Sequence, residues 1–212
     1  MPRFAALIIA FGLLPLCCGC DSADPASGDG TGSPAGDPNS AGPAQPDFRR
    51  EAWAEAGRQV EHEGLRVRIN RVAIEPVPLV KPATARRGEP EAAGTSKSPL
   101  LLIELELTNI SPERKLHYIG WASPSAVLGG LSARLQDAAG AKIPLHAFMA
   151  PLRPQGQITK PADLIQNEPI LEQLVFDPPA SPSSELFLEL PADNFDGKGH
   201  VRLKIPTSAI EK

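Results

Sequence analysis

The stretch that decides the fold is Leu100-Leu101-Leu102-Ile103-Glu104-Leu105-Glu106-Leu107-Thr108. Every odd-numbered residue in it is apolar, whereas Glu104, Glu106 and Thr108 stand at alternate positions. A period of two places successive side chains on opposite faces of a strand. The stretch therefore predicts a half-buried β-strand whose charged side faces solvent.

The chain on both sides of this stretch also alternates, with almost no helical periodicity. Apolar residues occupy every second position from 65 to 69, and the phase then shifts to Val72 and Ile74, which indicates a bulge near residues 70–71. The segment Asp137-Ala138-Ala139-Gly140 is typical of a hairpin turn with glycine at its end. Further strands are predicted at 115–121, 131–135, 141–145, 170–176, 185–190 and 200–205.

About seven to eight short strands separated by turn signals predict an all-β domain, an antiparallel β-sandwich of two sheets, spanning residues 48–212. An open barrel is the alternative architecture. Residues 48–56 contain good helix formers and predict a short helix or an irregular lead-in to the first strand.

Two connections are longer than ordinary, residues 75–99 and 147–169. Loops of this length are usually functional or disordered. The first has few apolar residues, which favours disorder, whereas the second contains six large apolar side chains and is expected to pack onto the domain. A helical turn is expected within it at 161–166.

The N-terminus has the layout of a secretory signal. Arg3 precedes an apolar run from Phe4 to Leu16, which is too short for a typical transmembrane helix and is followed by Cys17-Cys18-Gly19-Cys20. This ending resembles the bacterial lipobox, in which a small residue precedes an acylated cysteine. The resemblance implies a signal peptide over residues 1–19 and a diacylglycerol group on Cys20, usually with a further N-acyl chain such as palmitate. Acylation of Cys18 and an uncleaved N-terminal anchor are the alternatives.

Residues 20–47 form a predicted tether. From Asp21 to Asp47 the chain has no valine, isoleucine, leucine or aromatic residue, so it cannot bury enough apolar surface to offset the entropy of ordering. From Phe48 onward the chain has 20 basic and 20 acidic residues, once Arg3 and the five aspartates of the tether are set aside. This balance lacks the basic footprint of a nucleic-acid-binding protein.

A series of strand-and-turn motifs resembles uncharacterised bacterial lipoprotein domains with an immunoglobulin-like fold, related to the secreted immunoprotective extracellular antigen family. The motifs are the segments 105–111, 116–118, 135–140 and 173–179, with Glu168 before the last. The chain departs from the pattern at Gln166-Asn167, where a Pro-Gly pair is common, and residues 75–99 resemble an insertion. The resemblance implies an immunoglobulin-like sandwich and supplies no catalytic residue.

Candidate sites in the sequence are few. His146 and Met149 are an imidazole and a thioether in one loop, a ligand pair that suits copper(I), but two soft ligands are too few for a site. Tyr118 and Trp121 could form an aromatic binding patch, although packing in the core is the favoured interpretation. No nucleophile elbow, phosphate loop or close histidine pair is present, so the sequence predicts no enzyme, metal or cofactor.

The leading hypothesis is a membrane-anchored, non-catalytic lipoprotein of the cell envelope, facing the periplasm or the exterior, that acts as a binding or interaction module. Its expected contacts are the membrane, through the N-terminal lipid, and an unidentified envelope protein or small ligand. The alternative is a small-ligand or metal carrier that uses the 75–99 and 147–169 loops.

Overall fold

A computed structural model describes residues 57–82, 89–180 and 183–211, all within the unit Gln45–Lys212. The predicted signal peptide, tether and 48–56 lead-in lie outside the described residues. None of the helices in the described part of the chain is long and apolar enough to cross a membrane.

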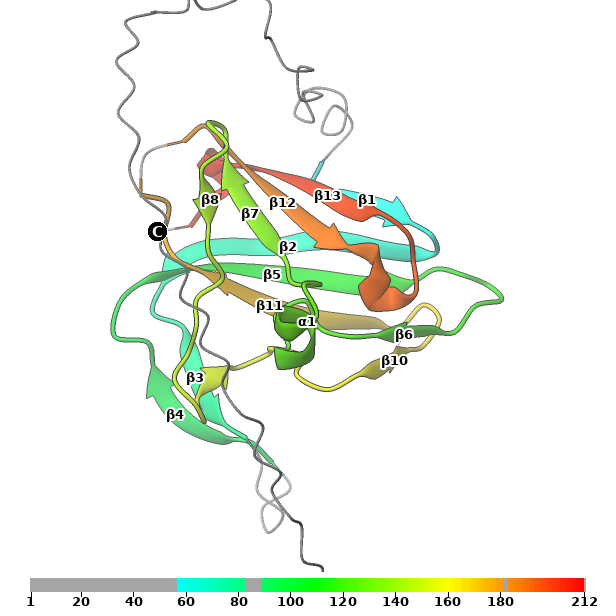
Figure 1. The fold of residues 1–212 in the computed structure, drawn as a ribbon, viewed down its shortest axis with the longest axis horizontal. Coiled ribbons are helices and arrows are strands. Elements are labelled where there is room, and N and C mark those ends of the chain that lie inside the picture. The colour runs from blue at the N-terminus through cyan, green and yellow to red at the C-terminus, as the bar shows by residue number, and fades with distance from the viewer. Residues whose placement is uncertain (1–56, 83–88, 181–182, 212) are drawn as a thin grey trace, which may run out of the picture. The chain divides into compact units, whose positions relative to one another are not determined.

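Two four-stranded antiparallel sheets face each other (Figure 1). The first sheet has the order β1 (Gln59–His62), β2 (Leu65–Glu75), β5 (Leu100–Asn109) and β11 (Pro169–Phe176). The second has the order β13 (His200–Pro206), β12 (Glu185–Pro191), β7 (Arg134–Asp137) and β8 (Lys142–Ile143). These eight strands confirm the predicted all-β sandwich, and the open barrel is not the architecture observed.

The deciding stretch forms β5, which pairs with β2 on one side and β11 on the other. Its odd-numbered residues are fully buried between the two sheets, as the alternation predicts. Leu100 and Leu102, on the opposite face, are also buried, because Val77, Val175 and the partly buried Phe148 pack against them. The strand is therefore half-buried only from Glu104 onward. The inward-facing residues of β5 are Leu101, Ile103, Leu105 and Leu107.

The predicted bulge in β2 is confirmed, because the register with β5 shifts between Ile69 and Arg71. The predicted hairpin is also confirmed, with β7 paired to β8 and the Gly140 N–H donating to the Asp137 carbonyl at 2.9 Å. Gly140 has a φ of +82°, a conformation that glycine adopts at little cost.

Both long connections contain strands, so the expectation of disorder in 75–99 was wrong for its described residues. β3 (Pro78–Lys81) pairs with β4 (Glu91–Thr95), and β9 (Arg153–Pro154) from the second connection pairs with the other edge of β3. The cross-chain pairing of β3 with β9, together with burial of Leu79 and Val80, orders a segment whose own composition favours disorder.

The helical turn expected at 161–166 was also wrong. β10 (Ala162–Leu164) pairs with β6 (Leu116–Tyr118), and Leu164 is buried in the core, so the tertiary partner decides the local structure. The helices are elsewhere: α1 (Pro124–Leu128) and two short 3₁₀ turns, η1 (Ala192–Phe195) and η2 (Thr207–Ala209). Ser123 caps α1 by accepting from the Ala126 N–H at 3.2 Å.

Asn109 joins three segments at the end of β5. Its buried side-chain amide donates to the Arg114 and Leu164 carbonyls, both at 3.0 Å, and accepts from the Ser111 N–H at 2.9 Å. We expect Asn109→Ala to lower the free energy of unfolding by about 1–3 kcal/mol, because these buried backbone groups lose their partner. Urea unfolding followed by tryptophan fluorescence measures the change.

Asn70→Ala is the matched control, since Asn70 makes no side-chain hydrogen bond among the described residues. We expect its effect to stay within about 0.5 kcal/mol. Equal effects of the two substitutions would contradict the role assigned to Asn109.

Candidate functional site

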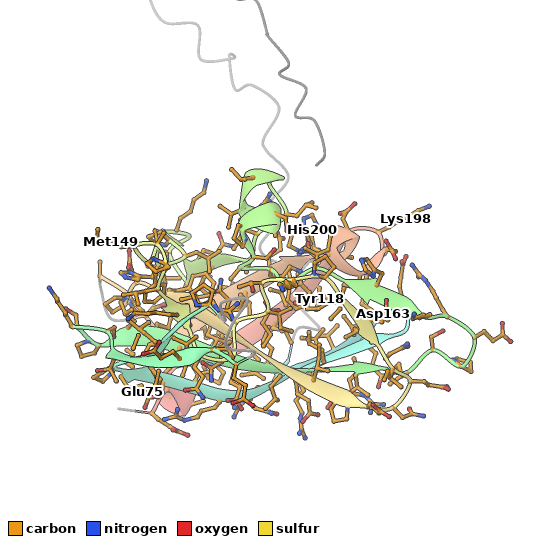
Figure 2. All side chains as sticks on the ribbon, turned by 90° about the horizontal axis from the view of Figure 1, so that it is seen from below. Glu75, Tyr118, Met149, Asp163, Lys198 and His200 are labelled. Atoms are coloured by element: carbon orange, nitrogen blue, oxygen red, sulfur yellow. The ribbon has the colours of Figure 1, made fainter. Side chains whose placement is uncertain are left out.

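Tyr118 and Trp121 lie in the core, as the sequence analysis predicted in preference to a binding patch. Tyr118 and Trp121 are both 0% exposed, and their rings meet edge to face with centroids 5.0 Å apart. The Trp121 indole N–H donates to the Pro191 carbonyl at 2.9 Å, which fixes the ring between the sheets. Figure 2 shows Tyr118 inside the domain, so neither ring offers a surface patch.

His146 and Met149 have different surroundings. The His146 Nδ1 lies 2.6 Å from a carboxylate oxygen of Asp177, and its ring packs edge to face on Phe148. Met149 is 85% exposed and lies at the periphery in Figure 2. Among residues 57–82, 89–180 and 183–211, no three histidine, cysteine, aspartate or glutamate side chains form a group able to hold a metal ion.

A buried carboxyl group that the sequence analysis did not single out lies beside Tyr118. Glu172 is opposite Leu105 in the register of β11 and β5, so it faces the core, where it is 0% exposed. The Tyr118 hydroxyl donates to its Oε2. Burial raises the pKa of Glu172 to about 8, although the hydrogen bonds from Tyr118 and from the backbone of Ala122 and Trp121 oppose that rise. The carboxyl is therefore mainly protonated at neutral pH.

The second long connection lies directly over this carboxyl. A Cβ atom placed on Gly120 would approach the Ile158 carbonyl oxygen to 2.2 Å and Glu172 Oε1 to 2.7 Å. The Gln157 side-chain amide donates to the Ala122 carbonyl, and the Gln173 N–H donates to the Gly156 carbonyl at 3.2 Å. The three residues 156–158 thus contact both the chain after β6 and the strand that carries Glu172.

A cavity of about 380 Å³ is also lined by two residues of this segment, Gly156 and Gln157. One wall comes from the 75–99 connection, through Val80, Glu89 and Pro90, and the other from residues 153–157. The two long connections singled out in the sequence thus meet around one cavity. It is lined by one guanidinium, one carboxylate and two side-chain amides, which can hold a small polar molecule by hydrogen bonds and charge.

The histidines of the chain each face an acceptor, which fixes their rings on the surface. His62 Nε2 lies 2.7 Å from the Lys198 carbonyl, and His117 Nδ1 lies 3.1 Å from Asp163. The third is His146, described above, and the fourth, His200, has its Nε2 3.8 Å from Glu189. None of the four lines the cavity.

No family model matches the chain, and no curated protein is similar to it by sequence. The fold is similar to that of two solved structures at 12% identity. The yjhA protein of Bacillus subtilis has a TM-score of 0.44, covering 74% of this chain and 98% of yjhA. The ycdA protein of Bacillus subtilis subsp. subtilis str. 168, provisionally named a lipoprotein, has a TM-score of 0.42, covering 73% of this chain and 40% of ycdA. The relation to the immunoprotective antigen family stays a prediction.

The buried carboxyl predicts a pH-dependent stability. Because its pKa rises from 4.5 in the unfolded chain to about 8 in the fold, the fold favours the protonated form. The contribution is fully present below pH 4.5 and is lost as the pH rises from 4.5 to about 8. We expect Glu172→Gln, which stays neutral, to remove this slope in urea unfolding measured from pH 5 to 9.

Glu104→Gln is the control, because Glu104 lies on the opposite face of the sheet and should leave the slope in place. A slope of the same size in Glu172→Gln would show that another group titrates.

A substitution at Gly120 tests the close contact between residues 156–158 and the core. We expect Gly120→Ala to lower the free energy of unfolding by at least about 2 kcal/mol, because its Cβ would overlap the Ile158 carbonyl. Gly57→Ala is the matched control, since its Cβ would meet its nearest neighbour at an ordinary 3.8 Å. Thermal unfolding of both variants measures the difference, and equal midpoints would contradict the contact.

Proposed function

We propose that the protein is a membrane-anchored, non-catalytic lipoprotein of the cell envelope whose domain acts as a binding module. The single observation that supports binding is the cavity between the 75–99 and 147–169 connections. These connections leave the two main sheets and meet each other through β3 and β9, so the sandwich serves as the scaffold and the connections form the site.

The anchor rests on the sequence at Cys20. Acylation there adds more than one chain, and two membrane signals are what stable anchoring requires, at about 0.8 kcal/mol per buried CH₂ group. The composition of residues 21–47 is that of a flexible spacer. The domain would therefore work in the layer next to the membrane.

The partner of this module is proposed to be an envelope protein. A small-ligand carrier is the second candidate, and it would use the same cavity as its ligand site. The metal version of that candidate has less support, because the His146 ring nitrogen is engaged by Asp177 and Met149 is exposed.

Labelling and crosslinking in cells test the anchor and the partner together. We expect an alkyne analogue of palmitate to label the wild-type protein and Cys18→Ala, and to leave Cys20→Ala unlabelled. We further expect one prey protein to be crosslinked to the acylated forms and lost with Cys20→Ala. Mass spectrometry of bait and prey reads both results.

Label that persists in Cys20→Ala and disappears in Cys18→Ala would move the acceptor to Cys18. A labelled protein without a specific prey would count against the protein partner and favour the carrier. A turnover abolished by one side-chain substitution would overturn the non-catalytic assignment.

A further inference from the structure

The cavity between the two long connections is a built part of the domain. β9 is hydrogen-bonded to β3, and the Gln155 N–H donates to the Pro78 carbonyl at 2.9 Å. On the far side, Gly156 accepts from the Gln173 N–H of β11. The wall formed by residues 153–157 is thus held by backbone hydrogen bonds at both ends, which favours a pre-formed site.

Arg153 carries the charge of this wall and has no acidic partner among the described residues. Six other arginines of the two main sheets and their connections, by contrast, have a carboxylate within 4.0 Å: Arg66, Arg68, Arg71, Arg114, Arg134 and Arg202. One Nη1–H of Arg153 donates to the Thr159 hydroxyl, and its Nε is buried without a hydrogen-bond partner in the described structure.

A guanidinium has five N–H donors in a fork that matches a carboxylate. Thr159 accepts from Nη1 and sets the orientation of the group, and Arg153 is one of the residues that line the cavity. A partly buried cation without a counter-charge is unfavourable, so a bound anion would complete the site. The charge on this wall therefore selects ligands with an anionic group.

The other wall supplies a carboxylate, Glu89. A ligand with several negative charges would be repelled by it, whereas a ligand with one carboxylate and one ammonium group meets an opposite charge at each wall. Val80 and the prolines Pro90 and Pro154 add apolar surface between the charged groups. The volume of about 380 Å³ is at the small end of ligand cavities, which run from about 300 to 1,000 Å³.

We propose that this cavity binds a small zwitterion, a free amino acid or short peptide, with its carboxylate on Arg153 and its ammonium group near Glu89. The inference rests on the binding function proposed above and names the ligand class of the carrier candidate. It does not depend on the lipid anchor or on a protein partner.

Calorimetric titration of the full-length lipidated protein in detergent tests the site. The probes are L-alanyl-L-alanine, its C-terminal amide, its N-acetyl form and inorganic phosphate. We expect saturable binding of the free dipeptide and at least about tenfold weaker binding of the amide, which lacks the carboxylate. Inorganic phosphate should bind more weakly than the dipeptide.

Substitutions test which charged group of the ligand binds at each wall of the cavity. We expect Arg153→Gln to weaken the dipeptide at least about tenfold. Glu89→Gln should weaken the free dipeptide and leave the N-acetyl form unchanged. Arg66→Gln, on the outer face of β2, is the control and should bind as the wild type does. Circular dichroism and the unfolding midpoint show whether each variant is folded. If Arg153→Gln does not fold, Arg153→Lys is used in its place, because it keeps the charge and loses the fork of N–H donors.

The absence of saturable dipeptide binding at about 10 mM would overturn the proposal, since affinities weaker than that correspond to less than about 3 kcal/mol. Tighter binding of phosphate, or an Arg153→Gln variant that binds normally, would overturn it too. Acylation at Cys20 and crosslinking to a prey protein are read from separate experiments, so a failed titration leaves those results standing.

Discussion

The domain depends on the burial of β5, a strand that is paired on both edges and covered by the second sheet. The strand is hydrogen-bonded along its length to β2 and β11, and its inward side chains are fully excluded from solvent by the second sheet. Each such leucine or isoleucine contributes about 1.5–3 kcal/mol when fully buried. Its outward face is divided, with Leu100 and Leu102 covered and Glu104 and Glu106 partly exposed. That division places the long connections over the first half of the strand.

Glu172 shows how the core tolerates a carboxyl group at its margin. The strand register forces this side chain inward, and the cost of burial is limited because the group stays protonated and accepts from the Tyr118 hydroxyl. Its other oxygen, Oε1, has no hydrogen-bond partner among the described residues, and it faces Gly120 and the segment that contains Ile158. The buried acid thus lies at the junction of the core and the second connection.

The sandwich could be predicted from the sequence because its signals are local. The alternation of β5, the phase shift in β2 and the Asp137–Gly140 turn are all read within about ten residues, and the structure confirms each of them. Helix α1 also has a local signal, a capping serine followed by proline, that the strand pattern around it obscured. Glu172 could have been found from its phase, since it stands between Ile170 and Leu174 on the apolar side of β11.

The candidate site could not be predicted in the same way, because it depends on pairing between distant segments. β3 and β9 are more than 70 residues apart, and each is short, with strand formation that depends on its partner. Nothing in the composition of either connection indicates that Arg153 and Glu89 border one cavity. The sequence did identify both connections by their length, which is the property that lets them leave the sheets and meet.

The buried acid and the cavity both adjoin one short segment, residues 156–158, and this links the core to the site. Residues 156–158 contact Gln173, Ala122 and the surroundings of Glu172, and residues 156 and 157 also line the cavity. The segment has few residues of its own in the core, so its position depends on these contacts. Ionisation of Glu172 would place an uncompensated charge in the core beside this segment, which is unfavourable, so the protonated acid is the form that suits the fold.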